Sequence, residues 1–389
     1  MDKEKKQTLH VFVVGNDDSV FDFSSPLFQK VSLYAKTLGR LTILCRTRKV
    51  VTKLPITRGP LTIYAVRSSN PLTFIIRAFV LGRRIINSNI EAFRVITSDN
   101  PFEEGLAAWI LARAFHLPLQ LQVHTDVMSP FFRQASWKEY IRYILARFLI
   151  PRADCARVVS RRIKNSILRK LGFFKADRLA KVVVLPIFTD ISKLIKAVPD
   201  PSVEACFKEY GFKMIAVGRL VDKEKNFGML IDLMRDFVKI YPAAILVLVG
   251  EGPDRKKYQK KIVTNGLDKN VILAGWRNDL PAFYKSFDLF LFPSNYEGWG
   301  RAVIEAMAAG LPVVMTDVGL AGEVVKNGEN GMVVPVRNKK MFLEAMLYLS
   351  KNKAQRRRLA EAGRASLFKL SPENQEKYLD FYKESLSKC

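Results

Sequence analysis

Short runs of apolar, largely β-branched residues alternate with stretches of helical periodicity along the whole chain. Runs of this length, bounded by polar and turn-forming residues, are typical of buried strands. Strands are predicted at 9–14, 41–45, 61–66, 94–97, 119–123, 156–159 and 182–185, and then at 213–217, 244–249, 271–274, 289–292, 312–316 and 331–334. The alternation of strands with helices predicts an α/β fold with parallel sheets.

A polar segment at 189–209, which contains Pro199 and Pro201, separates the two series of strands. Polar, proline-containing segments are typical of links between domains. We therefore predict two doubly wound, Rossmann-like domains at 1–192 and 193–372, with ligands at the carboxyl ends of the strands. Residues 373–389 are predicted to form a helix capped by Ser371, and the pattern leaves open whether it packs on its own domain or crosses back to the first.

The composition, with 49% hydrophobic residues in 389, is that of a globular protein. No apolar run reaches the roughly 18 residues that span a bilayer. The charged N-terminal stretch lacks the apolar core of a signal peptide. The cysteines lie far apart without a CxxC pair, which predicts reduced thiols in a cytoplasmic protein and neither a disulfide framework nor a zinc site. They are Cys45, Cys155, Cys206 and Cys389.

The chain is strongly basic, with a formal net charge of +26. Residues 1–190 hold 31 basic and 14 acidic side chains, and the stretch 133–181 alone holds 14 of the basic ones. Such a surface attracts polyanions, which include nucleic acid, anionic lipid and phosphorylated substrates. It is also compatible with a merely soluble basic protein, so the charge alone does not identify a partner.

The segment 289–314 predicts a strand, a glycine-rich turn and a helix that begins near Arg301. Such a turn exposes free backbone N–H groups at the positive end of the helix, where an anion binds well. Glu297 lies in the turn and Glu305 in the helix, and a carboxylate there can hold the hydroxyls of a sugar. Two glutamates at this spacing are also common as ordinary solvated side chains.

This segment resembles the Glu-(seven residues)-Glu signature of glycosyltransferase family 4, whose members are retaining enzymes of the GT-B fold. Further segments that resemble the family, in the family's order, lie at 217–227, 248–255, 271–280 and 317–335. The resemblance implies a GT-B fold in which Glu297 is catalytic. It also implies that Arg219, Lys225, Gly298, Trp299 and Gly300 hold the donor pyrophosphate, and that Glu305, Gly250, Gly252 and Arg277 hold the ribose and base. An arginine fork and a flexible lysine suit a pyrophosphate whose charge grows as the sugar bond breaks.

The N-terminal half resembles the family at fewer positions. The family's strand-end histidine, placed beside the transferred sugar, corresponds to His124, and a purely structural histidine is the alternative. The family often has a double glycine after the first strand, whereas this chain has only Gly15, followed by Asn16 and an acidic loop. Gly15 and Asn16 are the candidates for the acceptor side, and the partner of the acidic loop is left open.

The resemblance implies that a UDP- or GDP-sugar is the donor and that its anomeric configuration is retained. The leaving phosphate oxygen can then deprotonate the acceptor, so no enzymic nucleophile is needed. The chain has no Asp-x-Asp triplet and no cluster with metal-ligand spacing, which predicts no metal and no other cofactor. A lipid-linked or polysaccharide acceptor in cell-envelope glycan synthesis is the expected second substrate.

Apolar residues also recur at helical spacing between 137 and 148, with Lys138, Arg142 and Arg147 between them. They are Trp137, Tyr140, Ile141, Ile144, Leu145 and Phe148. Such a stripe faces a core more often than a membrane. The basic run around it favours the membrane, and in that interpretation the first domain docks peripherally on the inner face of an anionic membrane.

Two functions of other classes stay open on the sequence. A nucleic-acid-binding protein is compatible with the charge, but the chain lacks zinc-finger, helix-turn-helix and aromatic–basic RNA motifs, so no nucleic acid is expected as a partner. A non-transferase GT-B relative, such as a sugar-nucleotide epimerase, would use the donor pocket without an acceptor.

Overall fold

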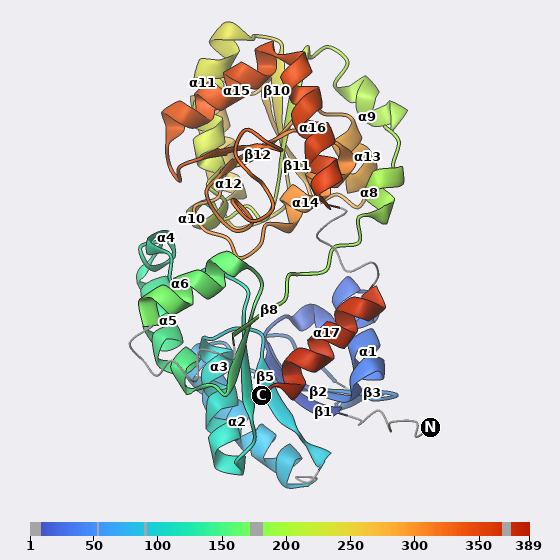
Figure 1. Ribbon diagram of the computed structural model, residues 1–389, viewed down its shortest axis with the longest axis vertical. Coiled ribbons are helices and arrows are strands. Elements are labelled where there is room, and N and C mark those ends of the chain that lie inside the picture. The colour runs from blue at the N-terminus through green and yellow to red at the C-terminus, as the bar shows by residue number, and fades with distance from the viewer. Residues whose placement is uncertain (1–8, 53, 89–91, 172–181, 368–374) are drawn as a thin grey trace. The chain divides into compact units, whose positions relative to one another are not determined.

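The computed structural model describes residues 9–52, 54–88, 92–171, 182–367 and 375–389. These residues form two α/β units (Figure 1). The first unit extends to Pro186 and includes the C-terminal helix, and the second begins at Ile187. The boundary predicted from the sequence lies at 192/193. Ser371, the predicted cap of the terminal helix, lies outside the described residues.

The first unit is built on an eight-stranded sheet with the order β3-β4-β2-β1-β5-β6-β7-β8. Its strands are β1 (Leu9–Gly15), β2 (Gly39–Thr47), β3 (Ile56–Arg58), β4 (Leu61–Arg67), β5 (Val95–Ser98), β6 (Leu119–Val123), β7 (Cys155–Val158) and β8 (Val182–Val184). All neighbours are parallel except β3 and β4. The seven strands predicted for this half are confirmed. Strand β3 was missed because it is three residues long and buries no side chain.

Helices connect these strands and cover the sheet (Figure 1). They are α1 (Pro26–Leu38), α2 (Pro71–Asn87), α3 (Glu103–Phe115), α4 (Pro130–Arg133), α5 (Trp137–Leu149), α6 (Arg161–Leu171) and the short 3₁₀ helices η1 (Asp18–Phe21) and η3 (Ile150–Arg152). Strands β5 and β6 are buried along their whole length. Burial on both faces explains why strands of a parallel sheet appear in the sequence as continuous apolar runs.

The C-terminal helix α17 (Gln375–Ser387) belongs to the first unit, so it crosses back, as one of the two predicted alternatives had it. It packs against α1, and its tyrosines Tyr378 and Tyr382 are buried. Cys389, just beyond it, forms a disulfide with Cys155 of β7 at a Cα–Cα distance of 5.2 Å. The prediction of reduced thiols is therefore wrong for this pair, because only the return of α17 brings together two residues so distant in sequence.

The second unit contains a six-stranded, fully parallel sheet with the order β11-β10-β9-β12-β13-β14. Its strands are β9 (Phe212–Val217), β10 (Ala244–Val249), β11 (Val271–Gly275), β12 (Leu289–Phe292), β13 (Val313–Thr316) and β14 (Met332–Val334). The six strands predicted here are confirmed. The helices are α8 (Ser192–Lys196), α9 (Pro201–Cys206), α10 (Asp222–Lys225), α11 (Phe227–Ile240), α12 (Arg255–Thr264), α13 (Leu280–Lys285), α14 (Arg301–Ala309), α15 (Lys339–Lys351) and α16 (Lys353–Leu367).

The segment 189–209, predicted as a link, contains α8 and α9 and belongs to the second unit. Helix α8 packs against α13 and α14, so its apolar residues serve the core of that unit. Its short length and its flanking prolines made it resemble a linker in the sequence.

The apolar stripe of α5 faces outward. Trp137 is 77% exposed, and Tyr140, Ile141, Ile144 and Phe148 are exposed as well, whereas Leu145 is half-buried. Of the two alternatives that the sequence left open, a core-facing and an outward-facing stripe, five of the six residues take the outward one. We call these five residues the α5 face. In the described part of the chain, every helix is too short or too polar to cross a bilayer.

Replacement of Leu379 by alanine tests the docking of α17. Leu379 is 1% exposed, and Phe381 on the same helix is 46% exposed. Leu379→Ala is expected to lower the free energy of unfolding by about 2–5 kcal/mol, because apolar burial is lost and a cavity remains. Phe381→Ala, the control, is expected to change it by about 1 kcal/mol or less. Urea denaturation measures both, and equal losses would contradict the packing of α17.

Candidate active site

The loops that follow the strands of the second unit converge at the carboxyl edge of its sheet. Strand β9 lies between β10 and β12, so the order of the chain reverses there. In doubly wound sheets such a switch point is where ligands bind. Arg219 and Lys225 follow β9, Gly250 follows β10, and Glu297 follows β12. The predicted donor residues therefore surround the switch point of this unit.

Two glycines allow the loops after β9 and β10 to touch backbone to backbone. Gly250 has φ +135°, and a Cβ atom there would lie 2.0 Å from the carbonyl oxygen of Gly218. A Cβ on Gly252 would meet the backbone of Leu220 at 2.5 Å. Any other residue at these positions would push the two loops apart. The predicted role of Gly250 and Gly252 at the donor stays a prediction, but their role in packing this edge is direct.

A network of charged side chains links the loops after β9 and β12. Lys225 Nζ donates a short hydrogen bond to Glu297 and lies 3.0 Å from Glu224 Oε1. Ser294 Oγ donates to the same oxygen of Glu297 at 3.0 Å. Arg219 Nη2 lies 3.6 Å from the second oxygen of Glu224. Three predicted donor residues, Arg219, Lys225 and Glu297, therefore meet in one network.

Burial and pairing both act on the protonation of this network. Burial raises the pKa of Glu297, and the Lys225 ammonium opposes that effect. Burial lowers the pKa of Lys225, but Glu297 and Glu224 outweigh it and hold this pKa above its usual range. Lys225 is therefore a permanent cation. Arg219, with 68% of its side chain exposed, adds a second cation that is open to solvent.

Asp222 holds the short helix α10, on which Lys225 lies, in place. Its Oδ1 accepts hydrogen bonds from the Gly228 N–H at 2.9 Å and from the Tyr258 hydroxyl at 3.0 Å, and its Oδ2 accepts one from Lys257 at 2.7 Å. Charge-assisted hydrogen bonds of this kind are among the stronger ones in proteins. The position of Lys225 thus depends on a carboxylate that sequence reasoning did not single out.

Helix α14 begins directly after the glycine-rich turn. Gly300, with φ +99°, is the N-cap residue of this helix. Glycine has no side chain, so it cannot cap the first N–H groups of the helix. Gly298 and Trp299 are buried, and the Trp299 carbonyl accepts a hydrogen bond from the Leu320 N–H at 3.0 Å. That contact fixes the turn against the loop after β13.

Glu305 and Arg277 are held by contacts of their own. Glu305 accepts from Arg301 at 3.0 Å and from the Tyr284 hydroxyl at 3.3 Å, and burial raises its pKa in spite of these contacts. Arg277 is paired with Asp279 and stacks on the ring of Phe283 at 4.5 Å. Their predicted roles at the ribose and base stay predictions, because no described contact joins either to Lys225 or Glu297.

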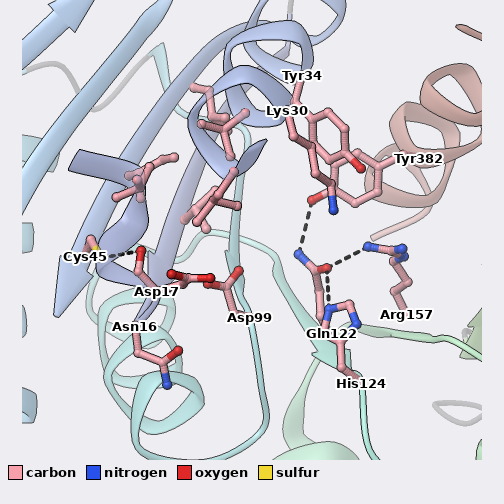
Figure 2. Close-up of a pocket in the computed structure, with 17 residues that line it drawn as sticks. Asn16, Asp17, Lys30, Tyr34, Cys45, Asp99, Gln122, His124, Arg157 and Tyr382 are labelled. Carbon is pink, nitrogen blue, oxygen red and sulfur yellow. Dashed lines mark hydrogen bonds between the residues drawn. The ribbon is translucent and has the colours of Figure 1, made fainter. Parts of the chain in front are cut away.

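The first unit contains a cavity of about 310 Å³ at the carboxyl end of its own sheet, next to the loop after β1 (Figure 2). It brings together all three residues predicted for this half, Gly15, Asn16 and His124. A Cβ atom on Gly15 would lie 2.3 Å from Asp99 Oδ2, which explains the need for glycine at that position. Burial, together with the charge of Glu104, raises the pKa of Asp99 to about 7.

The acidic loop is folded largely by its own side chains. Asp17 accepts hydrogen bonds from the backbone and hydroxyl of Ser19, and Asp22 does the same for Ser24. Asp18 pairs with Lys49 at 3.4 Å. These contacts shape the entrance to α1, and Asp17 also lines the cavity.

Further polar residues of the cavity were missed in the sequence. They are Lys30, Asp99, Gln122, Arg157 and Tyr382. A signal existed for two of them: Gln122 lies two residues before His124 and so shares its strand face, and Arg157 is a charge within a predicted apolar strand. Nothing in the sequence connects Tyr382 with this cavity, because it lies on α17.

Residues 205–366, which include every donor candidate named above, match the family described as Glycosyl transferases group 1. The chain carries a group 1 glycosyltransferase domain. An uncharacterized glycosyltransferase of Methanocaldococcus jannaschii is 26% identical to this chain over 297 residues, which cover 75% of each protein. The alpha-monoglucosyldiacylglycerol synthase of Acholeplasma laidlawii is 31% identical over 258 residues, 61% of this chain and 62% of that relative.

The fold of this chain is also that of solved structures. The crystal structure of Anabaena HepE in complex with UDP and glucose superposes with a TM-score of 0.72 at 17% identity, over 97% of this chain and 99% of that one. The structural neighbours of this chain are GT-B glycosyltransferases, so the predicted fold of two Rossmann-like units is confirmed.

Asp222→Asn tests the anchoring of α10. Burial raises the pKa of Asp222, but hydrogen bonds from Lys257, Gly228 and Tyr258 outweigh it, so the folded-state pKa lies below the ordinary value. Such a carboxylate contributes stability that is present above its unfolded pKa of about 3.9 and is lost as pH falls through the folded pKa. We expect the variant to lose about 1–3 kcal/mol of unfolding free energy at pH 7.

Urea denaturation at pH 7 and at successively lower pH measures this effect. The difference between variant and wild type should shrink as the pH falls below about 4, because the unfolded wild-type chain is protonated there first and the folded carboxylate becomes neutral at a lower pH. Asp236→Asn serves as the control, since that exposed aspartate pairs only with surface cations. An equal loss in both variants would contradict the anchoring role.

Proposed function

We propose that this protein is a retaining, metal-independent glycosyltransferase that moves a sugar from a UDP- or GDP-sugar to a lipid-linked or polysaccharide acceptor. The observation that carries the proposal is the buried Lys225–Glu297 pair at the switch point of the family domain. A largely buried cation beside a carboxylate, next to a helix N-terminus without a capping side chain, is suited to a diphosphate joined to a sugar.

The donor's diphosphate would lie between Arg219, Lys225 and the start of α14. Two cations and a helix terminus stabilise the charge that develops on the leaving diphosphate, which is the function a metal serves in other transferases. Glu305 would hold the ribose hydroxyls. The similarity to HepE, whose crystal structure is a complex with UDP and glucose, supports a nucleotide-sugar donor.

Transfer with retention needs no covalent enzyme intermediate in this proposal. The leaving phosphate oxygen takes the proton of the acceptor hydroxyl on the same face of the sugar from which it departs. Glu297, held by Lys225 and Ser294, would bind hydroxyls of the transferred sugar, and the family resemblance makes His124 the candidate for a further contact with it. Both residues act by orientation and hydrogen bonding.

The acceptor would approach from the first unit, and a membrane surface is the proposed place. The α5 face is exposed, and the chain around it is basic, with Lys138 and Arg147 on the same helix and Arg133 just before it. Aromatic and aliphatic residues beside basic ones are typical of helices that lie in an anionic lipid interface. The relative named for synthesis of a glucosylated diacylglycerol supports a lipid acceptor. We therefore propose a peripheral, cytoplasmic location.

A thermal-shift panel of UDP- and GDP-sugars tests the donor site. At a concentration of 100 Kd a true donor should stabilise the protein by about 2.7 kcal/mol. Glu305→Ala is expected to weaken the affinity by about 10- to 100-fold, because a charge-assisted hydrogen bond of about 1.5–3 kcal/mol is lost. Glu361→Ala, on the exposed face of α16, should leave it unchanged.

The same panel identifies the donor for a turnover assay. Free UDP or GDP should be released only when a glycan or lipid acceptor is present, because transfer needs both substrates. Release that is independent of any acceptor, or a Glu305→Ala variant with wild-type affinity and turnover, would contradict the proposal.

Co-sedimentation with vesicles tests the membrane surface. Ile144 and Ile240 are each 51% exposed, the first on the α5 face and the second on α11 of the other unit, so they form a matched pair. Ile144→Ser should weaken binding to anionic vesicles by about 5- to 30-fold, since about 1–2 kcal/mol of apolar burial is lost. Ile240→Ser should have no effect. Binding that is insensitive to salt, or equal in both variants, would contradict docking through α5.

A further inference from the structure

Gln122 lies at the centre of a hydrogen-bonded cluster next to His124 (Figure 2). It is the fourth residue of β6, and its side chain points to the same side of the sheet as that of His124, two residues on. Its neighbours are Arg157 from β7 and Tyr382 from α17, both of which are buried.

The orientation of the Gln122 amide is fixed by Arg157. Its Oε1 atom lies 2.7 Å from Nη1 of Arg157. A guanidinium can only donate hydrogen bonds, so the atom that faces it must be the carbonyl oxygen. The Nε2 atom then faces the Tyr382 hydroxyl at 3.1 Å and the Thr97 hydroxyl at 3.4 Å, both of which can accept.

This orientation decides which nitrogen of His124 carries the proton. His124 Nε2 lies 3.2 Å from the same Oε1 of Gln122, and a carbonyl oxygen can only accept. Nε2 must therefore be protonated. Burial, with the charges of Arg157 and Lys30, lowers the pKa of His124 to about 3, so the ring is neutral near pH 7 and Nδ1 carries no proton.

We propose that Gln122 and Arg157 are positioning residues that hold His124 as the neutral Nε2–H tautomer, so that Nδ1 accepts a hydrogen bond from a hydroxyl of the transferred sugar. The substrate contact rests on the proposed function. The tautomer does not, because it follows from the contacts of Gln122 together with the burial of His124 near two positive charges. A neutral imidazole with a bare Nδ1 can receive a hydroxyl proton in a hydrogen bond, whereas an imidazolium or an Nδ1–H ring cannot.

Helix α17 completes this arrangement from the far end of the chain. Arg157 Nη2 donates to the Tyr378 hydroxyl at 2.6 Å, so Arg157 is itself held by α17. Two tyrosines of one helix thus support the pair that orients His124. This gives the return of α17 to the first unit a role beyond packing.

The test is ¹⁵N NMR of the full chain labelled at histidine. The protein has only three histidines, so their ring signals can be assigned by substitution. His124 should show a protonated Nε2 and a bare Nδ1 at all pH values from 5 to 8. An Nδ1–H tautomer or an imidazolium at pH 7 would overturn the proposal. The titratable groups that share the cavity with His124 are Asp17, Lys30, Tyr34, Cys45, Asp99, Arg157 and Tyr382.

Three variants separate the contributions of the cluster. Gln122→Met removes the acceptor and should give a mixture of both tautomers. Gln122→Glu keeps an acceptor for both Arg157 and His124, so it should keep the Nε2–H tautomer and raise the His124 pKa. Tyr382→Phe leaves Arg157 in place and should leave the tautomer unchanged. An unchanged tautomer in folded Gln122→Met, or an unchanged His124 pKa in Gln122→Glu, would overturn the role of Gln122.

Addition of the donor found in the thermal-shift panel tests the substrate contact. The Nδ1 resonance of His124 should shift on binding, and those of His10 and His116 should not. A donor that binds without moving the Nδ1 signal would overturn the sugar contact while the tautomer assignment stands. Absence of binding by every sugar nucleotide would instead contradict the proposed function.

Discussion

The buried ion pair between Lys225 and Glu297 is the interaction on which the second unit's site depends. An ammonium removed from water is stable only with its carboxylate, and each partner left alone would be strongly unfavourable. The pair therefore joins the loop after β9 to the loop after β12 across the switch point. The close backbone packing at Gly250 and the anchoring by Asp222 hold the loop after β9 in place, and the Asn295 N–H, which donates to the Glu224 carbonyl at 2.8 Å, joins it to the loop after β12.

The first unit also contains a buried cation, but the groups around it are neutral. Its buried cation is Arg157, and the groups that satisfy it are the neutral Gln122, Tyr378 and the backbone of Leu185. Neutral partners leave a positive charge near His124, which helps to keep that ring uncharged. One unit thus pairs its buried cation with a carboxylate, and the other surrounds it with dipoles.

The sequence predicted the strands of both sheets because buried parallel strands are apolar runs, a local property that any window along the chain reveals. The family resemblance supplied Arg219, Lys225 and Glu297 as candidates, and the structure brings these three into one network of charged side chains. The sequence did not predict the Cys155–Cys389 bond or the contacts of Gln122, and it left open whether the α5 face lies inside or outside. Each of these depends on which elements pack together, and α17 in particular meets its neighbours only through the tertiary fold.

The return of α17 also constrains the order in which the chain can fold. During synthesis the first unit emerges long before residues 375–389, so Arg157 and the buried Gln120 lack their final partners until that segment has been made. Domains usually complete folding in the order of synthesis. Here the N-terminal unit cannot complete its packing until the second unit and α17 have been synthesised. A C-terminal extension or truncation would therefore affect the half of the molecule that was synthesised first.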